Sequence, residues 1–153
     1  MKYCLDTSAW LDGWARDYPP DVFPTLWEKI DDLISDGTIN ATEEVYVELK
    51  KKDDSIIEWM KTRKQLFIPI SEEIQEIVIE LLSDHPRLVD THRQRSQADP
   101  FVIATAESEG AIVVTGEIPR GKLDKPKIPD VCAHRGTPCI SFLEMLRKIG
   151  WRF

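Results

Sequence analysis

The segment ADPFVIATAESEGAIVVTGE, residues 98–117, contains the strongest structural signals in the chain. Asp99 followed by Pro100 indicates a helix start, because Asp accepts hydrogen bonds from the free amides of a first turn and Pro at the first helical position gives up no needed donor. We therefore expect a helix over 101–109. The continuous apolar run 111–115 that follows is typical of a strand buried on both faces of a parallel sheet.

Strand and helix signals alternate along the rest of the chain. Short β-prone runs stand at 2–5, 38–41, 66–70 and 139–140. Helical patterns stand at 8–17, 22–36, 42–49, 55–60, 71–82 and 142–149. Ser55 with Glu58, and Ser141 with Glu144, have the capping-box spacing of helix starts. Strands that alternate with helices imply right-handed crossovers and a mostly parallel sheet covered on both faces, so we expect an α/β fold.

The composition is that of one ordinary globular domain spanning residues 1–153. Apolar residues make up 42% of the chain and charged residues 31%, which excludes disordered, collagenous and disulfide-scaffold classes. No apolar run approaches the ~18 to 20 residues that cross a bilayer, and Asp6 interrupts the apolar stretch that a signal peptide needs. The widely spaced Cys4, Cys132 and Cys139 fit free thiols in a reducing compartment. We therefore expect a cytoplasmic protein without a membrane segment.

The formal net charge of −7 argues against a protein that coats nucleic acid through bulk electrostatics. Binding of RNA would need a local basic patch, and the segments 85–98 and 116–138 each offer one. The second segment is too long for an ordinary connection, so we expect a long basic loop there. The basic residues that could contact RNA are Arg93, Arg95, Arg120, Lys122, Lys125 and Lys127. A solvated surface loop is the competing interpretation.

Four acids lie close enough to the predicted strands to meet at one edge of the sheet. Asp6 follows the first strand, and Glu117 follows the buried one. Asp99 begins the helix that leads into the buried strand, and Glu48 lies on the helix after the second strand, four residues beyond Glu44. Ligands of open parallel sheets bind outside the carboxyl ends of the strands, so these acids are candidate functional residues. Helix capping and helical ion pairs are their structural interpretations.

Four segments of the chain form a recognisable set: Cys4-Leu5-Asp6-Thr7-Ser8, Val47-Glu48-Leu49, 98–106 and 113–117. In order and spacing they resemble the PIN-domain nucleases, especially the VapC-like toxin branch. The resemblance implies a PIN-like three-layer domain, with a central mostly parallel sheet flanked by helices. It also implies a metal-dependent endoribonuclease, the toxin of a toxin–antitoxin pair, with a protein antitoxin and a homodimer as partners.

The resemblance assigns the binding of Mg²⁺ or Mn²⁺, and the catalysis, to the acids Asp6, Glu48, Asp99 and Glu117. Carboxylate oxygen and water are the ligands that hard divalent cations prefer. A water made more acidic by such an ion would attack the phosphorus of an RNA phosphodiester. Hydroxyls that could orient the water or the phosphate are those of Thr7, Ser8 and Thr115.

Two features depart from the usual pattern of this branch. Glu117 stands where Asp is more usual, and Asp130 is the alternative fourth acid. Lys50-Lys51-Lys52 stands where a glycine often follows the helical Glu. The chain therefore resembles a divergent subgroup.

Other functions stay open at this point. The main alternative is a catalytically silent PIN-like module that binds a protein partner and uses the acids only to cap helices. A DNA-specific nuclease is a third possibility. A zinc site at Cys132, His134 and Cys139 is disfavoured, because the spacing fits no standard finger and a fourth ligand is missing.

Overall fold

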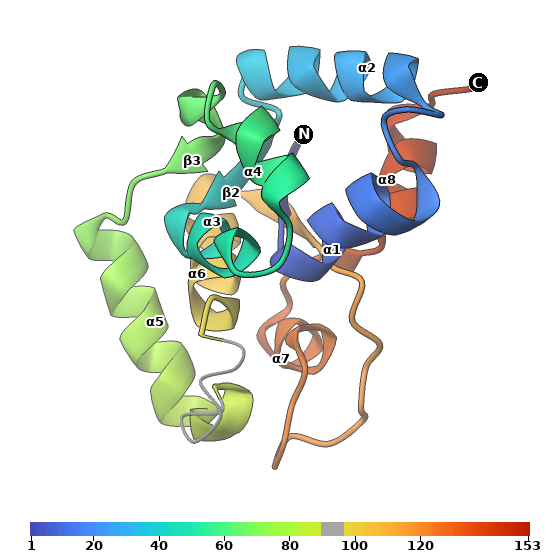
Figure 1. Cartoon of the computed structure of the whole chain (residues 1–153). Helices are drawn as coiled ribbons and strands as arrows, with labels where there is room; N and C mark the ends of the chain where they lie inside the picture. The colour runs from blue at the N-terminus through green and yellow to red at the C-terminus, as the bar shows by residue number, and fades with distance from the viewer. Residues whose placement is uncertain (90–96) are drawn as a thin grey trace.

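Short parallel strands form one sheet at the centre of the protein (Figure 1). The computed structural model describes residues 1–89 and 97–153, so Arg93 and Arg95 lie outside the described part of the chain. The strands are β1 (Lys2–Leu5), β2 (Ile39–Thr42), β3 (Phe67–Ile68), β4 (Ala111–Val114) and β5 (Cys139–Ile140). Each pairing is parallel, in the order β3-β2-β1-β4-β5. The expected α/β class with a parallel central sheet is therefore confirmed.

The strand order creates a topological switch beside β1. From β1 the chain proceeds outward through β2 and β3, and it then returns to the other side of β1 with β4 and β5. β1 pairs with β4 along its whole length, up to Leu5 beside Val114. Ligands of open parallel sheets bind outside the carboxyl ends of the strands at such a switch. The residues directly after Leu5 and Val114 therefore occupy the edge where a ligand is expected.

Helices cover both faces of the sheet, which gives the three-layer arrangement of a PIN-like fold (Figure 1). The first half of the chain forms α1 (Thr7–Leu11), the π-helical segment η1 (Asp12–Asp17), α2 (Pro24–Ser35), α3 (Glu43–Lys50) and α4 (Asp54–Met60). The second half forms η2 (Lys64–Leu66), α5 (Glu72–Asp84), η3 (Pro86–Leu88), α6 (Asp99–Glu109), α7 (Ile128–Arg135) and α8 (Phe142–Ile149). α6 packs against β1, β2 and β4, and α5 packs on α6.

Tryptophans fix the helix that follows the first strand. Trp10, Trp14, Trp27 and Trp59 form one cluster, with ring centroids between 4.9 and 6.4 Å apart in the contacting pairs. Buried aromatic rings of this size dominate the packing energy of a core. The cluster joins α1 and η1 to α2 and α4, and it thereby sets the direction of the helix that begins after Asp6.

The caps of α4 and α6 differ from the sequence-based expectation. α4 is capped by Asp53, whose carboxylate accepts a hydrogen bond from the amide of Ile56 at 3.0 Å. The expected cap Ser55 lies within the helix, where its hydroxyl accepts a hydrogen bond from the indole of Trp14. α6 begins at Asp99 itself, with its N-cap one residue earlier. Both caps lie one or two residues closer to the N-terminus than expected. A shift of this size is common, because residue propensities alone do not fix a helix boundary more closely.

The expectation of a long loop over 116–138 is wrong in its second half, because Ile128–Arg135 forms α7. Pro129 lies in the first turn of α7, where it gives up no needed donor, and Gly136 ends the helix with a φ of 74°. The basic stretch that stays outside regular structure is therefore 116–127.

The cysteines and the helix lengths agree with the sequence-based expectation. Cys4 and Cys132 are buried, Cys139 is half-buried, and all three carry free thiols. In residues 1–89 and 97–153, none of the helices has both the length and the apolar character needed to cross a membrane.

Candidate functional site

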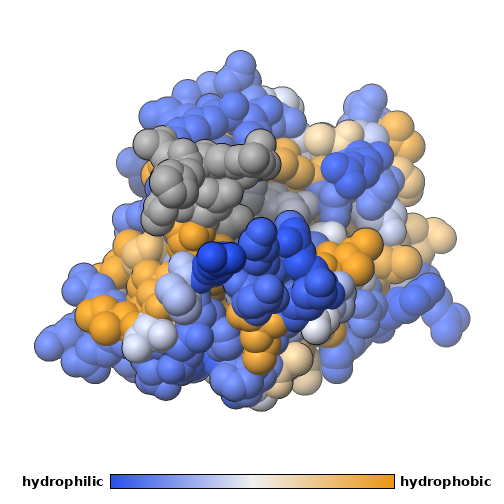
Figure 2. All heavy atoms as spheres, turned by 90° about the horizontal axis from the view of Figure 1, so that it is seen from below, coloured by the Kyte–Doolittle hydropathy of each residue, from blue (hydrophilic) through white to orange (hydrophobic). Residues whose placement is uncertain are grey.

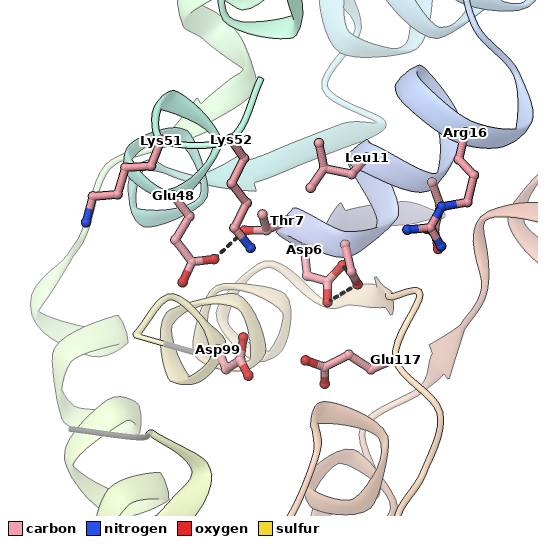
Figure 3. Close-up of a pocket in the computed structure, with 11 residues that line it drawn as sticks. Asp6, Thr7, Leu11, Arg16, Glu48, Lys51, Lys52, Asp99 and Glu117 are labelled. Carbon is pink, nitrogen blue, oxygen red and sulfur yellow. Dashed lines mark hydrogen bonds and ion pairs between the residues drawn. The ribbon is translucent and has the colours of Figure 1, made fainter. Parts of the chain in front are cut away.

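A cleft of about 650 Å³ lies at the carboxyl edge of the sheet. Its lining residues are Asp6, Thr7, Ser8, Leu11, Asp12, Arg16, Glu48, Lys51, Lys52, Asp99 and Glu117. The predicted site acids thus come together, and their side chains point toward a common space (Figure 3). Seen from below the view of Figure 1, the coloured surface is mostly hydrophilic with several hydrophobic patches (Figure 2).

Asp6 is held by groups from both central strand ends. Its side chain is almost fully buried, at 3% exposure. It caps α1 by accepting a hydrogen bond from the amide of Ala9 at 2.7 Å. The hydroxyl of Ser8 donates to Oδ1 at 2.8 Å, and the hydroxyl of Thr115 donates to Oδ2 at 2.5 Å. Because Thr115 directly follows β4, the Asp6 carboxylate joins the ends of β1 and β4 across the switch point.

Glu48 connects three helices around the cleft. It lies on α3, and the hydroxyl of Thr7, the first residue of α1, donates to its Oε1 at 2.6 Å. The amide of Ala98, the N-cap of α6, donates to its Oε2 at 3.2 Å. The Glu48 carboxylate is therefore fixed at the starts of α1 and α6, next to the residue that precedes Asp99.

Asp99 and Glu117 are the other two predicted acids that line the cleft. Asp99 lies in the first turn of α6 and is 8% exposed. The Oε2 atom of Glu117 accepts a hydrogen bond from the amide of Ile128, the first residue of α7, at 2.9 Å. The amide of Glu117 donates to the Thr115 hydroxyl at 3.0 Å. Glu117 is therefore tied both to α7 and to the threonine that holds Asp6.

The surroundings of Asp6 favour its protonated form. Burial raises the pKa of Asp6 to about 7, because the charged carboxylate loses its hydration. Hydrogen bonds from Thr115, Ala9 and Ser8 lower this pKa, and the negative charge of Glu117 raises it. A cation in the cleft would oppose the effects of burial and of the Glu117 charge, because it favours the ionised carboxylate.

One acid and three cations that line the cleft were not among the site residues predicted from the sequence. Asp12 begins η1 and forms an ion pair with Arg16 at 3.0 Å. Burial raises the pKa of Asp12, and the charge of Arg16 opposes that effect. Lys51 and Lys52 follow α3 (Figure 3). The spacing of Asp12, four residues after Ser8, is the signal that places it on the same helix face as the site.

The backbone at Gly116, after β4, lies close to the side chains of Asp12 and Ser8. A Cβ atom built on Gly116 would collide with the carboxylate of Asp12. The amide of Gly116 donates to the Ser8 hydroxyl at 2.9 Å. Ser8 therefore bridges this turn and the carboxylate of Asp6.

The hydroxyls predicted to orient water or phosphate each hold a carboxylate in this structure. Thr7 donates to Glu48, and Ser8 and Thr115 donate to Asp6. A carboxylate oxygen that accepts one such bond keeps another lone pair in a fixed direction. The three hydroxyls thus position the acids, and their contact with a substrate stays a prediction.

Of the two candidates for the fourth acid, Glu117 lines the cleft and Asp130 lies outside it. Asp130 is absent from the cleft lining, and its carboxylate accepts hydrogen bonds from the amides of Arg120, Gly121 and Lys127 at 2.8 to 3.0 Å. Burial alone would raise the pKa of Asp130, but these amide bonds outweigh it and lower the pKa. Asp130 therefore organises the segment before α7.

The predicted RNA-contacting residues lie elsewhere. Arg120, Lys122, Lys125 and Lys127 belong to the segment 116–127 and do not line the cleft, and neither does Glu44. Arg93 and Arg95 lie outside the described residues. Contact between these basic residues and RNA stays a prediction.

The donor atoms of the cleft fit a hard divalent cation such as Mg²⁺ or Mn²⁺. The donor side chains among the lining residues are carboxylates and hydroxyls, without thiol or imidazole. In the described part of the chain, no group of three or more His, Cys, Asp or Glu side chains is arranged so that it could hold a metal ion, and this includes Cys132, His134 and Cys139. Because Mg²⁺ usually contacts only one or two protein carboxylates and keeps several waters, the cleft fits an ion held partly through water.

One protein-family model covers almost the whole chain. A family described as a domain of unknown function, DUF4411, matches residues 3–153. The matched region begins within β1 and includes every residue that lines the cleft. No curated protein matches the sequence.

Proposed function

The chain belongs to the DUF4411 family, and we propose that it is a metal-dependent endoribonuclease of the PIN-domain, VapC-like type. The reaction is hydrolysis of an RNA phosphodiester bond. The observation that carries this proposal is the convergence of Asp6, Glu48, Asp99 and Glu117 in one cleft at the switch point of the sheet. These acids come from four separate stretches of the chain, and the cleft is where they meet.

Helix capping accounts for only part of this arrangement. Asp6 caps α1, but the N-cap of α6 is Ala98. Glu48 lies near the C-terminal end of α3, where the helix dipole disfavours an acid. The Glu48 carboxylate is held instead at the starts of α1 and α6, by the hydroxyl of Thr7 and the amide of Ala98, so it does not stabilise its own helix.

One or two of the four acids would hold Mg²⁺ or Mn²⁺ directly, and the others would contact it through water. Bound there, such an ion lowers the pKa of a water and stabilises negative charge at the phosphoryl group. The protein supplies fixed positions: Thr115 and Ser8 orient the carboxylate of Asp6, and Thr7 orients that of Glu48. With a pKa of about 7, the carboxyl group of Asp6 releases its proton near neutral pH when a cation approaches.

The role as toxin of a toxin–antitoxin pair belongs to the same proposal and rests on the resemblance to VapC-like toxins. It includes a protein antitoxin and a homodimer as partners. We expect expression of the chain alone to arrest growth of the host cell, and expression of Asp99→Asn to leave growth unchanged.

Cleavage of an end-labelled RNA pool tests the nuclease directly. The purified chain is incubated with Mg²⁺, Mn²⁺ or a chelator, beside Asp99→Asn and beside Glu76→Gln, which removes an exposed acid of α5 outside the cleft. We expect cleavage that requires the metal, persists in Glu76→Gln and disappears in Asp99→Asn. DNA of the same sequence, tested in parallel, separates an RNA-specific from a DNA-specific enzyme.

Two results would contradict the proposal. Cleavage that survives in Asp99→Asn would come from a contaminating nuclease. Absence of cleavage together with co-purification of a protein partner would favour the catalytically silent binding module.

A further inference from the structure

We infer that Arg16, Lys51 and Lys52 bind the phosphates on either side of the bond to be cut, so that an RNA strand crosses the cleft from the end of α3 to η1. This inference rests on the proposed nuclease function, and it names the residues that hold its substrate. All three side chains line the cleft. None of them belongs to the basic segments 85–98 and 116–138 that the sequence pattern singles out.

The cleft has buried acids between two exposed basic rims. Asp6 and Asp99 are 3% and 8% exposed. Lys51 and Lys52 are exposed, and the side chain of Arg16 is 74% exposed. The lysines lie on one side of Asp6 and Arg16 lies on the other (Figure 3). A phosphate that reaches the acids therefore has a cation-bearing rim on both sides.

A polyanionic strand needs such cations because the protein as a whole repels it. The net charge is −7, and five of the lining residues are acids. Lys and Arg contacts to phosphate supply attraction and fix the register of the strand, without reading its sequence. Cations on opposite sides of the acids would hold the strand at two points and so place the intervening phosphate over the cleft.

Arg16 is held in position by a partner that leaves donors free. Its Nη1 atom pairs with Oδ1 of Asp12, which lies against Gly116. A guanidinium carries five N–H donors, so Arg16 can contact a phosphate while this pair persists. The guanidinium is largely exposed, so its remaining N–H donors can be reached from solvent.

The salt dependence of RNA binding tests the inference apart from cleavage. Each variant is made in an Asp99→Asn background, and binding of a fluorescent single-stranded RNA is measured by anisotropy in Mg²⁺ at several salt concentrations. Each lost phosphate contact reduces the slope of log K against log salt by about 0.7 for a single strand, which is about fivefold in affinity at 0.1 M salt. We expect the slope to be reduced by about 0.7 in Arg16→Gln and by about 1.4 in the double variant Lys51→Gln with Lys52→Gln.

Two matched variants control for charge and folding. Lys148→Gln removes an exposed cation on α8, outside the cleft, and should keep the parent slope. Arg16→Lys keeps the positive charge and should also keep the parent slope. Binding by the parent background with an unchanged slope in Arg16→Gln and in the double lysine variant would overturn this inference alone. Failure of the wild-type chain to bind or cleave RNA would overturn the proposed function as well.

Discussion

Asp6 and Asp130 are both buried, at 3% and 7% exposure, yet their surroundings move their pKa values in opposite directions. Asp6 accepts hydrogen bonds from two hydroxyls and one amide, and burial raises its pKa to about 7. Asp130 accepts hydrogen bonds from three backbone amides. Burial would raise the pKa of Asp130 too, but the amide bonds and the charge of Arg120 lower it.

The difference separates a structural carboxylate from one that suits a ligand. Asp130 has its negative charge compensated by the backbone around it, so it needs no further partner. Asp6 lies beside Glu117 in a cleft whose other acids add negative charge, and its ionised form stays costly until a cation arrives. Hydrogen bonds lower the pKa of both acids, so the two differ in whether burial outweighs those bonds and in the neighbouring charge, which is negative (Glu117) at Asp6 and positive (Arg120) at Asp130.

The largest expected effect is on catalysis by Asp6→Asn. Asn still caps α1, because its side-chain oxygen accepts from the same amide, but it removes the anionic ligand. We expect the rate of RNA cleavage to fall by about 10³-fold or more, since several kcal/mol of charge stabilisation are lost. Single-turnover cleavage at saturating enzyme measures this, and Glu76→Gln should keep the parent rate. A loss of less than tenfold in Asp6→Asn would contradict the assignment.

The two acids should also give opposite dependences of stability on pH in the presence of a chelator. Because the pKa of Asp6 is raised on folding, the folded state binds more protons than the unfolded state between about pH 4 and about pH 7, and stability falls as the pH rises through that interval. Asp6→Asn lacks this pH-dependent contribution to stability. As the pH rises through the same interval, the melting temperature of the parent should therefore fall relative to that of Asp6→Asn.

Asp130 has the reverse sign. Its pKa is lowered on folding, so its contribution is present above about pH 4 and is lost as the pH falls below that value. The loss of stability in Asp130→Asn relative to the parent should therefore become smaller as the pH falls below about 4. Melting curves that run parallel for the parent and both variants across this range would contradict the comparison.

Asp130→Asn should cost stability and spare catalysis. Hydrogen bonds to a charged acceptor are stronger than neutral ones, and the amide side chain cannot accept from all three backbone amides. We expect unfolding to become easier by about 2 kcal/mol, which lowers the Tm by about 4 to 8 °C. Thermal denaturation measures this loss. A cleavage rate reduced as strongly as in Asp6→Asn, at a temperature where the variant is folded, would assign Asp130 to the site.

Much of the fold and of the acidic site could be predicted from the sequence. The apolar run at 111–114 and the Asp99-Pro100 start have local causes that tertiary contacts do not change, and they correspond to β4 and the start of α6. Asp6 and Glu117 lie at the carboxyl edge because a parallel sheet brings strand ends together.

The remaining site residues depend on contacts that a linear pattern does not show. Asp12 and Arg16 face the cleft because the tryptophan cluster sets the direction of α1 and η1. Lys51 and Lys52 resemble an ordinary solvated charge run until α3 is packed beside α1. The missed helix α7 had a local signal in Pro129, followed by Asp130 and later by Gly136, that the basic character of the segment obscured.

Thr115→Val should give the smallest of these effects. Valine keeps the shape of the side chain but removes the hydroxyl that donates to Asp6, and that bond lowers the pKa of Asp6. The rising limb of the pH–rate profile should therefore move to higher pH by about one pH unit, the equivalent of about 1.4 kcal/mol. Thr105→Val changes a buried threonine of α6 outside the cleft and should leave the profile in place.

Calorimetric titration of Mn²⁺ into the chain near neutral pH tests most directly that the cleft acids act together on a divalent cation. The wild-type chain and Glu76→Gln should bind Mn²⁺ with the same affinity, and binding should release protons because the carboxyl group of Asp6 is partly protonated at this pH. Asp6→Asn and Asp99→Asn should lose this binding. Equal Mn²⁺ binding in all four proteins, or no binding in the wild-type chain, would contradict the account.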